Sequence, residues 1–399
     1  MKIVQINATC GTGSIGKICR AVSELLTVKG IENYILYTQG VSDYNLGINC
    51  GNPKDSKRYA IESRLLGNYG FNAKSNTERI IKELKRISPD VVHIHNIHSH
   101  DCNFSTLFRY LKENHIKVFY TFHDCWAFTG YCMYFDAVNC EKWKSTCCNC
   151  PQKKKFSWFF DRSSELQQLK KDALKDLDLT IITPSEWLAG LTRESFLGSY
   201  PIKVINNGID LGIFKPTPSD FRTKYHIEDK FILLGIASRW EVRKGLDTFI
   251  KLSKQLDESY QIVLVGTTPE LDKTLPSNII SIHRTEGQKQ LAEIYTAADV
   301  LVNPTMEENF PTVNIESIAC GTPVITYNTG GSAEMLDTNT GKVVEKGNFT
   351  SLLTTIKDTR TNYNFLSRDL LQRASMYAQY DRYMEYVNLY VSIRLRTSI

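Results

Sequence analysis

A carboxylate stands at each end of Glu308-Asn-Phe-Pro-Thr-Val-Asn-Ile-Glu316, and Ser-Ile-Ala-Cys-Gly321-Thr-Pro-Val-Ile follows at once. Pro311 suits the first turn of a helix, where its missing N–H is no loss, and Gly321 suits the left-handed position after the last turn. Thr312 and Glu316 then share one face near the helix N-terminus. Unpaired N–H groups and the helix dipole make that end a seat for phosphate. The pattern predicts a ligand with hydroxyl groups on both sides of a diphosphate.

Two cations precede this run in the same half of the chain. The apolar run 231–237 predicts a buried strand, Arg239 and Lys244 follow it, and residues 246–256 predict a helix. Ligands of open α/β sheets bind beyond the carboxyl ends of the strands, where both cations fall. Arginine grips phosphate oxygens bidentately and lysine supplies a point charge. The alternative is two solvated loop cations.

These features together resemble the donor half of the retaining glycosyltransferases of family 4, and the resemblance covers most of the chain. It rests on Arg239, the Lys244-Gly245 pair, the Glu308–Glu316 run and the Ala319-Cys-Gly-Thr-Pro tail. It implies the α/β fold called GT-B, in which two Rossmann-like doubly wound domains face a central cleft. The activity it implies is transfer of a sugar from a UDP- or GDP-linked donor to an acceptor hydroxyl with anomeric retention.

The resemblance also assigns roles to residues. It implies catalytic roles for His123, Glu308, Arg239 and Lys244. Donor-binding residues would be Gly13, Ser14, Arg239, Lys244, Arg284, Glu308, Phe310, Pro311, Thr312, Val313 and Glu316. Arg239, Lys244 and the helix dipole would replace a divalent cation, so we expect catalysis without a metal or other cofactor.

Strand-like and helix-like segments alternate almost throughout, which predicts parallel sheets covered by helices. At 399 residues the chain suits two domains. We expect an acceptor-side domain over 1–205, a nucleotide-sugar domain over 206–375, and a terminal helix over 376–399 that returns to the first domain. The expected strands are 2–6, 33–37, 90–94, 117–122, 179–183, 203–205, 231–237, 261–265, 279–282, 300–302 and 323–326.

The composition of the chain indicates its cellular compartment and the classes of partner that it can bind. Met1-Lys-Ile-Val-Gln-Ile predicts a strand and not a secretion signal, and no apolar run reaches the roughly 20 residues that cross a bilayer. We therefore expect a cytoplasmic protein. The net charge of +5 is too mild for a dedicated nucleic-acid binder. Lys153–Phe160 and the basic helix that carries Arg79 and Lys82 could touch an anionic membrane, or could be solvated surface.

A glycine loop, Gly11-Thr-Gly13-Ser-Ile-Gly16, follows the first strand and fits the dinucleotide fingerprint. That fingerprint also needs an acid after the second strand, where Thr38-Gln39-Gly40 stands, so a nicotinamide site is disfavoured. The loop resembles the family-4 loop that lies near the donor phosphates and the acceptor. His123 ends a later strand, where an imidazole could bond a sugar hydroxyl or serve only the structure.

Two groups of residues invite a metal interpretation that we do not favour. His93, His95, His98 and His100 cluster along one segment, but no carboxylate set accompanies them. We expect them to line the acceptor side. Asp176-Leu-Asp178 precedes a strand instead of ending one, so its carboxylates should lie at the wrong edge of the sheet.

Cysteines form the other unusual feature. Of eleven, five fall in Cys132-x7-Cys140-x6-Cys147-Cys148-x-Cys150, within an insert over about 125–151. Disulfides are a poor default in a reducing cytosol. Cys132, Cys140, Cys147 and Cys150 are candidate ligands of a structural zinc, and free thiols are the alternative. The insert resembles a family-4 subgroup associated with bacterial capsule and exopolysaccharide assembly, which implies a saccharide or lipid-linked saccharide acceptor.

Two further function classes stay open at this point. One is a sugar-nucleotide epimerase or NAD-type oxidoreductase built from the same doubly wound domains. The other is a non-catalytic, zinc-containing interaction module. The joint presence of Glu308, Glu316, Arg239 and Lys244 favours the transferase.

Overall fold

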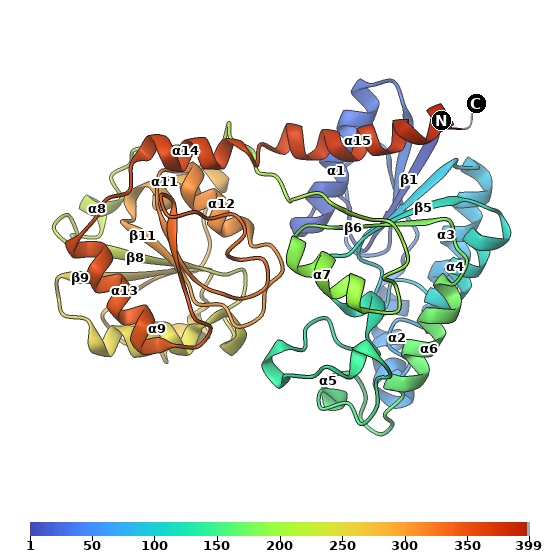
Figure 1. Cartoon of the computed structure of the whole chain (residues 1–399), viewed down its shortest axis with the longest axis horizontal. Coiled ribbons are helices and arrows are strands. Elements are labelled where there is room, and N and C mark those ends of the chain that lie inside the picture. Colours follow the sequence, from blue (N-terminus) through green and yellow to red (C-terminus); the bar gives the residue numbers. More distant parts are fainter. Residues whose placement is uncertain (397–399) are drawn as a thin grey trace. The chain divides into compact units, whose positions relative to one another are not determined.

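The computed structural model describes residues 1–396 and divides the chain into two α/β units (Figure 1). One unit comprises Met1–Ile205 with the chain from Tyr383 on, and the other comprises Asn206–Arg382. Each unit has one sheet whose neighbouring strands all run parallel. The predicted architecture of parallel sheets covered by helices is confirmed.

The first unit holds a seven-stranded sheet in the order β3-β2-β1-β4-β5-β6-β7. Its strands are β1 (Lys2–Asn7), β2 (Glu32–Tyr37), β3 (Gly47–Asn49), β4 (Val91–Ile94), β5 (Lys117–Thr121), β6 (Leu179–Thr183) and β7 (Ile202–Val204). Its helices are α1 (Gly13–Val28), α2 (Pro53–Leu66), α3 (Lys74–Ile87), α4 (Phe104–Glu113), α5 (Lys153–Phe156), α6 (Ser163–Leu174) and α7 (Glu186–Glu194).

Both faces of this sheet are covered, which is why its central strands are apolar runs and not alternating ones. Helices α3, α4 and α6 contribute to the core on one face. On the other face, α1 packs with α15 (Gln379–Arg396), the red helix beside it in Figure 1. Tyr383, Tyr386 and Tyr390 of α15 are buried there against Ile3 and Phe119. The terminal helix therefore completes the first unit.

The second unit holds a six-stranded sheet in the order β10-β9-β8-β11-β12-β13. Its strands are β8 (Phe231–Ile236), β9 (Tyr260–Val265), β10 (Ile279–Ile282), β11 (Val300–Asn303), β12 (Val324–Tyr327) and β13 (Gly341–Val344). Its helices are α8 (Phe221–Lys224), α9 (Leu246–Gln255), α10 (Pro269–Asp272), α11 (Gln288–Ala297), α12 (Thr312–Ala319), α13 (Phe349–Thr361) and α14 (Ser367–Ser375). Helices α9 and α13 cover one face, and α11, α12 and α14 cover the other (Figure 1).

Two boundaries differ from expectation. Pro311 is the residue before α12 and not part of its first turn, because its ψ of 111° is extended. The second unit ends at Arg382 and not at residue 375. Ala378 forms a parallel bridge with Ile209, whose N–H donates to the Tyr377 carbonyl at 2.9 Å. This pairing holds the start of α15 in the second unit.

Candidate functional site

The start of α12 is fixed by buried amides in the second unit. Asn303, the last residue of β11, donates through Nδ2 to Asn314 Oδ1 at 2.8 Å. Asn314 Nδ2 donates in turn to the Ser332 carbonyl at 3.2 Å, and its side chain is fully buried. Buried amides are costly to leave unpaired, so these bonds lock the helix N-terminus to the strand end and to the 329–332 loop.

A close backbone approach fixes the loop that carries Glu308. Gly330 has φ +57°, and a Cβ there would lie 1.8 Å from the Glu308 carbonyl oxygen. The Gly331 N–H donates to the Asn309 carbonyl at 2.7 Å. A side chain at position 330 would therefore push the two loops apart, and glycine is required.

The loop that carries Lys244 is bound to the same region. Gly245 has φ +79°, and a Cβ there would approach the Pro304 carbonyl oxygen to 2.5 Å. The Met306 N–H donates to the Arg243 carbonyl at 2.8 Å. The Lys244 ammonium consequently donates a hydrogen bond to the Glu308 carboxylate. Their side chains are only 22% and 15% exposed, so solvent screens this ion pair weakly.

Glu316 lies half-buried on the first turns of α12, one turn beyond Thr312. Tyr295 of α11 donates its hydroxyl to Glu316 Oε2 at 2.8 Å. Burial raises the pKa of Tyr295 well above its usual value, so the phenol remains a donor. Tyr295 was not among the predicted site residues, because a tyrosine at a helical core position gives no functional signal.

The remaining predicted donor residues differ in exposure. Arg239 follows β8, is 84% exposed, and pairs through Nε with Glu241 at 3.1 Å. Arg284 follows β10 and is also exposed. Phe310 is buried against Tyr377, with ring centroids 5.9 Å apart, so its main chain and not its ring is available to a ligand. The buried Pro311 and the half-buried Thr312 and Val313 form the helix start.

The glycine loop of the first unit is tightly folded. The Gly11 N–H donates to the Gly16 carbonyl at 3.0 Å, and a Cβ at Gly16 would lie 2.6 Å from Thr9 Oγ1. Gly13, with φ +67°, opens α1, and both it and Ser14 are exposed. The predicted loop residues are therefore accessible at the carboxyl end of β1.

An acid that was not predicted, Asp101, lies at the end of β2. Thr38 Oγ1 and Gln39 Nε2 donate to Asp101 Oδ1 at 2.6 and 2.7 Å. Asp101 is 2% exposed, and burial raises its pKa to about 6. The sequence did not indicate this carboxylate at the end of β2, because Asp101 belongs to the segment after β4, more than sixty residues along the chain from both donors.

His123 belongs to a chain of polar contacts beyond the carboxyl ends of β4 and β5. His95 Nδ1 and His123 Nε2 are 3.2 Å apart, and the rings stack at 5.5 Å. His98 Nε2 lies 2.8 Å from Asp124 Oδ2. All four side chains line one pocket, whose empty volume is about 210 Å³ including the solvent at its mouth. Burial lowers the pKa of His123 to about 4, so at neutral pH the ring has one donor and one acceptor nitrogen.

The other members of the histidine cluster have separate surroundings. The rings of His93 and His95 lie close together, with centroids 4.0 Å apart. The ring nitrogens of His93 bond Thr121 Oγ1 and the Tyr390 hydroxyl of α15, so its role is structural. Tyr69 packs edge-on against His100.

No three His, Cys, Asp or Glu side chains within residues 1–396 are already arranged as a metal cage. Asp178 pairs with Lys117 Nζ at 2.6 Å, and Asp176 lies 4.0 Å from Lys112 Nζ. Both acids precede β6, at the amino-terminal edge of the sheet, as expected.

Known proteins match both halves of the chain. Residues 30–212 match the family described as Glycosyltransferase Family 4, and residues 219–378 match Glycosyl transferases group 1. WcaC of Escherichia coli (strain K12), named as a colanic acid biosynthesis glycosyl transferase, is 22% identical over 98% of this chain and 100% of its own.

Solved structures share the whole fold. Sucrose-phosphate synthase from Thermosynechococcus elongatus has a TM-score of 0.72 at 17% identity and covers 99% of both chains. Anabaena Alr3699/HepE in complex with UDP-glucose has a TM-score of 0.63 at 15% identity, over 98% of this chain and 100% of its own.

Two parallel α/β units with this fold define the class of GT-B glycosyltransferases. Within that class, the chain belongs to glycosyltransferase family 4. Membership favours glycosyl transfer over the oxidoreductase and epimerase alternatives. Among residues 1–396, no helix is both long enough and apolar enough to span a membrane.

Proposed function

We propose that this protein transfers a hexose from a nucleotide-diphosphate sugar to an acceptor hydroxyl and retains the anomeric configuration. The observation that carries the proposal is the Lys244–Glu308 ion pair, held by Gly245 and Gly330 in the same unit as the N-terminus of α12. A cation and a helix N-terminus bind a diphosphate, and a carboxylate accepts a hydrogen bond from a sugar hydroxyl.

Each group has a distinct task in this proposal. Lys244 and Arg239 stabilise the charge that grows on the leaving diphosphate, together with the N–H groups at the start of α12. Glu316, oriented by Tyr295, accepts hydrogen bonds from the ribose hydroxyls. Glu308 holds hydroxyls of the donor sugar. The neutral ring of His123 offers one donor and one acceptor nitrogen to a sugar hydroxyl.

The reaction breaks the bond between the anomeric carbon and a diphosphate oxygen and forms a bond from that carbon to the acceptor oxygen on the same face. The acceptor proton passes to the leaving diphosphate. Retaining hydrolases use two carboxylates about 5 Å apart as acid and nucleophile. We assign Glu308 and Glu316 to donor binding instead, since they flank the diphosphate seat. Lysine, arginine and the helix dipole supply the positive charge that a metal would otherwise bring.

The likeness to WcaC supports a role in bacterial exopolysaccharide synthesis, with a saccharide or lipid-linked saccharide as acceptor. The Anabaena structures with UDP and UDP-glucose support a nucleotide-linked hexose donor. Trp158, Phe159 and Phe160 are 54%, 62% and 57% exposed beside three lysines of α5. Exposed aromatic rings next to lysines suit the anionic cytoplasmic face of a membrane.

Thermal stabilisation by a panel of UDP- and GDP-sugars identifies the donor. With that donor, we expect nucleotide diphosphate to be released when an acceptor is added, and the product anomer to match the donor by NMR. Transfer should continue in the presence of a chelator. A nicotinamide-dependent absorbance change, or no stabilisation by any sugar nucleotide, would overturn the proposal. Co-sedimentation with anionic but not neutral vesicles tests the membrane contact.

A further inference from the structure

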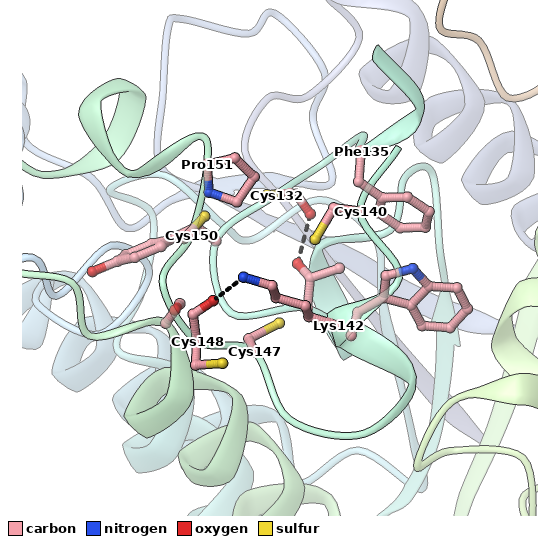
Figure 2. A pocket seen from close by; sticks show the side chains of 12 residues that line it. Cys132, Phe135, Cys140, Lys142, Cys147, Cys148, Cys150 and Pro151 are labelled. Atoms are coloured by element: carbon pink, nitrogen blue, oxygen red, sulfur yellow. Dashed lines mark hydrogen bonds between the residues drawn. The ribbon is translucent and has the colours of Figure 1, made fainter. Parts of the chain in front are cut away.

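The insert between β5 and α6 brings cysteines from distant positions to one pocket. Five of them line it together with Lys142 and Trp143, and its empty volume is about 310 Å³ including the solvent at its mouth (Figure 2). They are Cys132, Cys140, Cys147, Cys148 and Cys150. No disulfide joins any of the eleven cysteines, all of which lie in the described residues. Glycosyl transfer as proposed above makes no use of this pocket.

Four of the five cysteines differ from the fifth in burial. Cys132 is buried, and Cys140, Cys147 and Cys150 are half-buried. Cys148 is exposed. Burial therefore separates a set of four thiols, Cys132, Cys140, Cys147 and Cys150, from Cys148, which follows Cys147 directly in the chain.

Hydrogen-bond donors already face two of these sulfurs. The Gly130 N–H donates to Cys147 Sγ at 3.3 Å, and Gln152 Nε2 donates to Cys132 Sγ at 3.5 Å. A neutral thiol is a weak acceptor, whereas a thiolate accepts strongly. Donors outside the ligand set that orient metal-bound groups are a regular part of metal sites.

Two lysine side chains, Lys170 and Lys142, place amino groups near the pocket. Lys170 of α6 is fully buried, and its Nζ donates to the Trp126, Thr129 and Gly130 carbonyls at 2.7, 2.9 and 3.3 Å. In the described part of the chain, no carboxylate lies within 4.0 Å of it. Lys142 Nζ donates to the Cys148 and Asn149 carbonyls at the pocket. Burial lowers the pKa of Lys170 well below its usual value, so its charged form needs negative charge nearby.

We propose that Cys132, Cys140, Cys147 and Cys150 bind one structural Zn²⁺ as four thiolates. The four thiol protons leave on binding, so the site has a net charge of about −2, which the Lys170 and Lys142 ammonium groups offset. A tetrahedral all-sulfur set selects zinc and leaves no open position for catalysis. Because these side chains do not yet form a cage, the sulfurs converge when the metal binds.

The zinc would add to the hydrophobic contacts of the insert, where Phe128, Phe135 and Trp143 are already buried in the core of the first unit. Between β5 and α6 the chain forms only the short turns η1 (Trp126–Phe128), η2 (Asp136–Val138) and η3 (Lys142–Lys144) before the four-residue α5. Pro151 and Gln152 connect Cys150 directly to α5, from which the exposed rings of Trp158–Phe160 follow. Fixing Cys150 therefore fixes the base of the exposed aromatic stretch.

Metal analysis of the purified full chain tests the proposal. We expect one zinc ion per chain, loss of zinc in Cys132→Ser and Cys147→Ser, and retention in the matched control Cys148→Ser. The Gln152→Ala variant should bind zinc about 10–100-fold more weakly, as outer contacts of metal ligands typically do.

A second measurement decides the matter if the serine variants do not fold. Cobalt added to the metal-free wild-type chain should give the thiolate-to-cobalt charge-transfer bands of a tetrahedral all-sulfur site. Wild-type protein that lacks zinc and shows no such bands would overturn the proposal. So would an intact mass lowered by disulfides among these cysteines, or loss of metal from Cys148→Ser as complete as from Cys147→Ser.

Discussion

The ammonium group of Lys244 donates a hydrogen bond to the carboxylate of Glu308, although 64 residues separate them in the chain. The pair persists because Gly245 lies against Pro304 and Gly330 lies against the Glu308 backbone. In the proposed reaction, the lysine meets the departing diphosphate while the carboxylate holds the sugar.

Lys244→Ala should lower the rate of transfer by about 10²–10³-fold, because one preorganised charge on the leaving group is lost. The thermal midpoint should fall as well, because the Glu308 carboxylate, only 15% exposed, loses its ion-pair partner. Steady-state kinetics with the identified donor measure the effect. Lys251→Ala, at an exposed position of α9, is the matched control. Turnover equal in the two variants would remove Lys244 from the mechanism.

Arg239→Ala should lower transfer by about 10²–10³-fold while leaving the fold intact. Its guanidinium is 84% exposed and pairs with Glu241, and such surface pairs contribute little to stability. Arg243 also pairs with Glu241, at 3.5 Å, so Arg243→Ala disturbs the same carboxylate without touching the proposed phosphate contact. An equal loss of activity in both variants would show that the loss comes from the ion pairs with Glu241. It would rule out a role specific to Arg239.

Much of the fold could be predicted from local patterns. Buried parallel strands are continuous apolar runs, and every expected strand is present with its ends shifted by at most one residue. β3 and β13 were not predicted, since each is a short edge strand with a glycine and partly exposed residues. Such segments have no apolar run to detect.

The site was predicted only in part, because sequence patterns identify residue types and not their partners. Lys244 and Glu308 were each singled out, but their pairing depends on two glycine contacts between distant loops. Tyr295 was overlooked because its ring occupies a core position of α11, and only its hydroxyl reaches Glu316.

Tyr295→Phe should raise the KM for the donor by about 2–10-fold with little change in kcat, the cost of one lost hydrogen bond. The reason is that Glu316 loses the 2.8 Å bond that orients it toward the ribose. Initial rates over a range of donor concentrations separate the two constants. Tyr327→Phe, another buried tyrosine of this unit, should leave both unchanged. A lower kcat at constant KM in Tyr295→Phe would contradict ribose binding by Glu316.

Gly330→Ala should lower both the thermal midpoint and the transfer rate. The added Cβ would lie 1.8 Å from the Glu308 carbonyl oxygen, and the left-handed backbone costs about 1–2 kcal/mol for a non-glycine residue. Calorimetry and kinetics on the same preparation measure both effects. Gly287→Ala is the control, because its Cβ meets no atom within 4 Å. If the two alanine variants behave alike, the Gly330 approach does not position Glu308.

The buried histidines predict a stability that falls as the solution becomes more acidic. Burial lowers the pKa of His93 to about 3 and of His123 to about 4, and lowers that of His95 well below its usual value. In the unfolded chain each would titrate near 6.5. Below about pH 6.5 the unfolded state therefore binds protons that the folded state does not, and the free energy of unfolding decreases with falling pH.

His93→Gln should reduce this slope by about 1.4 kcal/mol per pH unit between about pH 4 and pH 6, since one fewer proton is taken up on unfolding. Denaturant unfolding at a series of pH values measures the slope. His115→Gln is the control, because water surrounds this exposed side chain in both states. A slope in His93→Gln as steep as that of the wild type would show that the His93 ring, despite its bonds to Thr121 and Tyr390, is protonated in the folded protein.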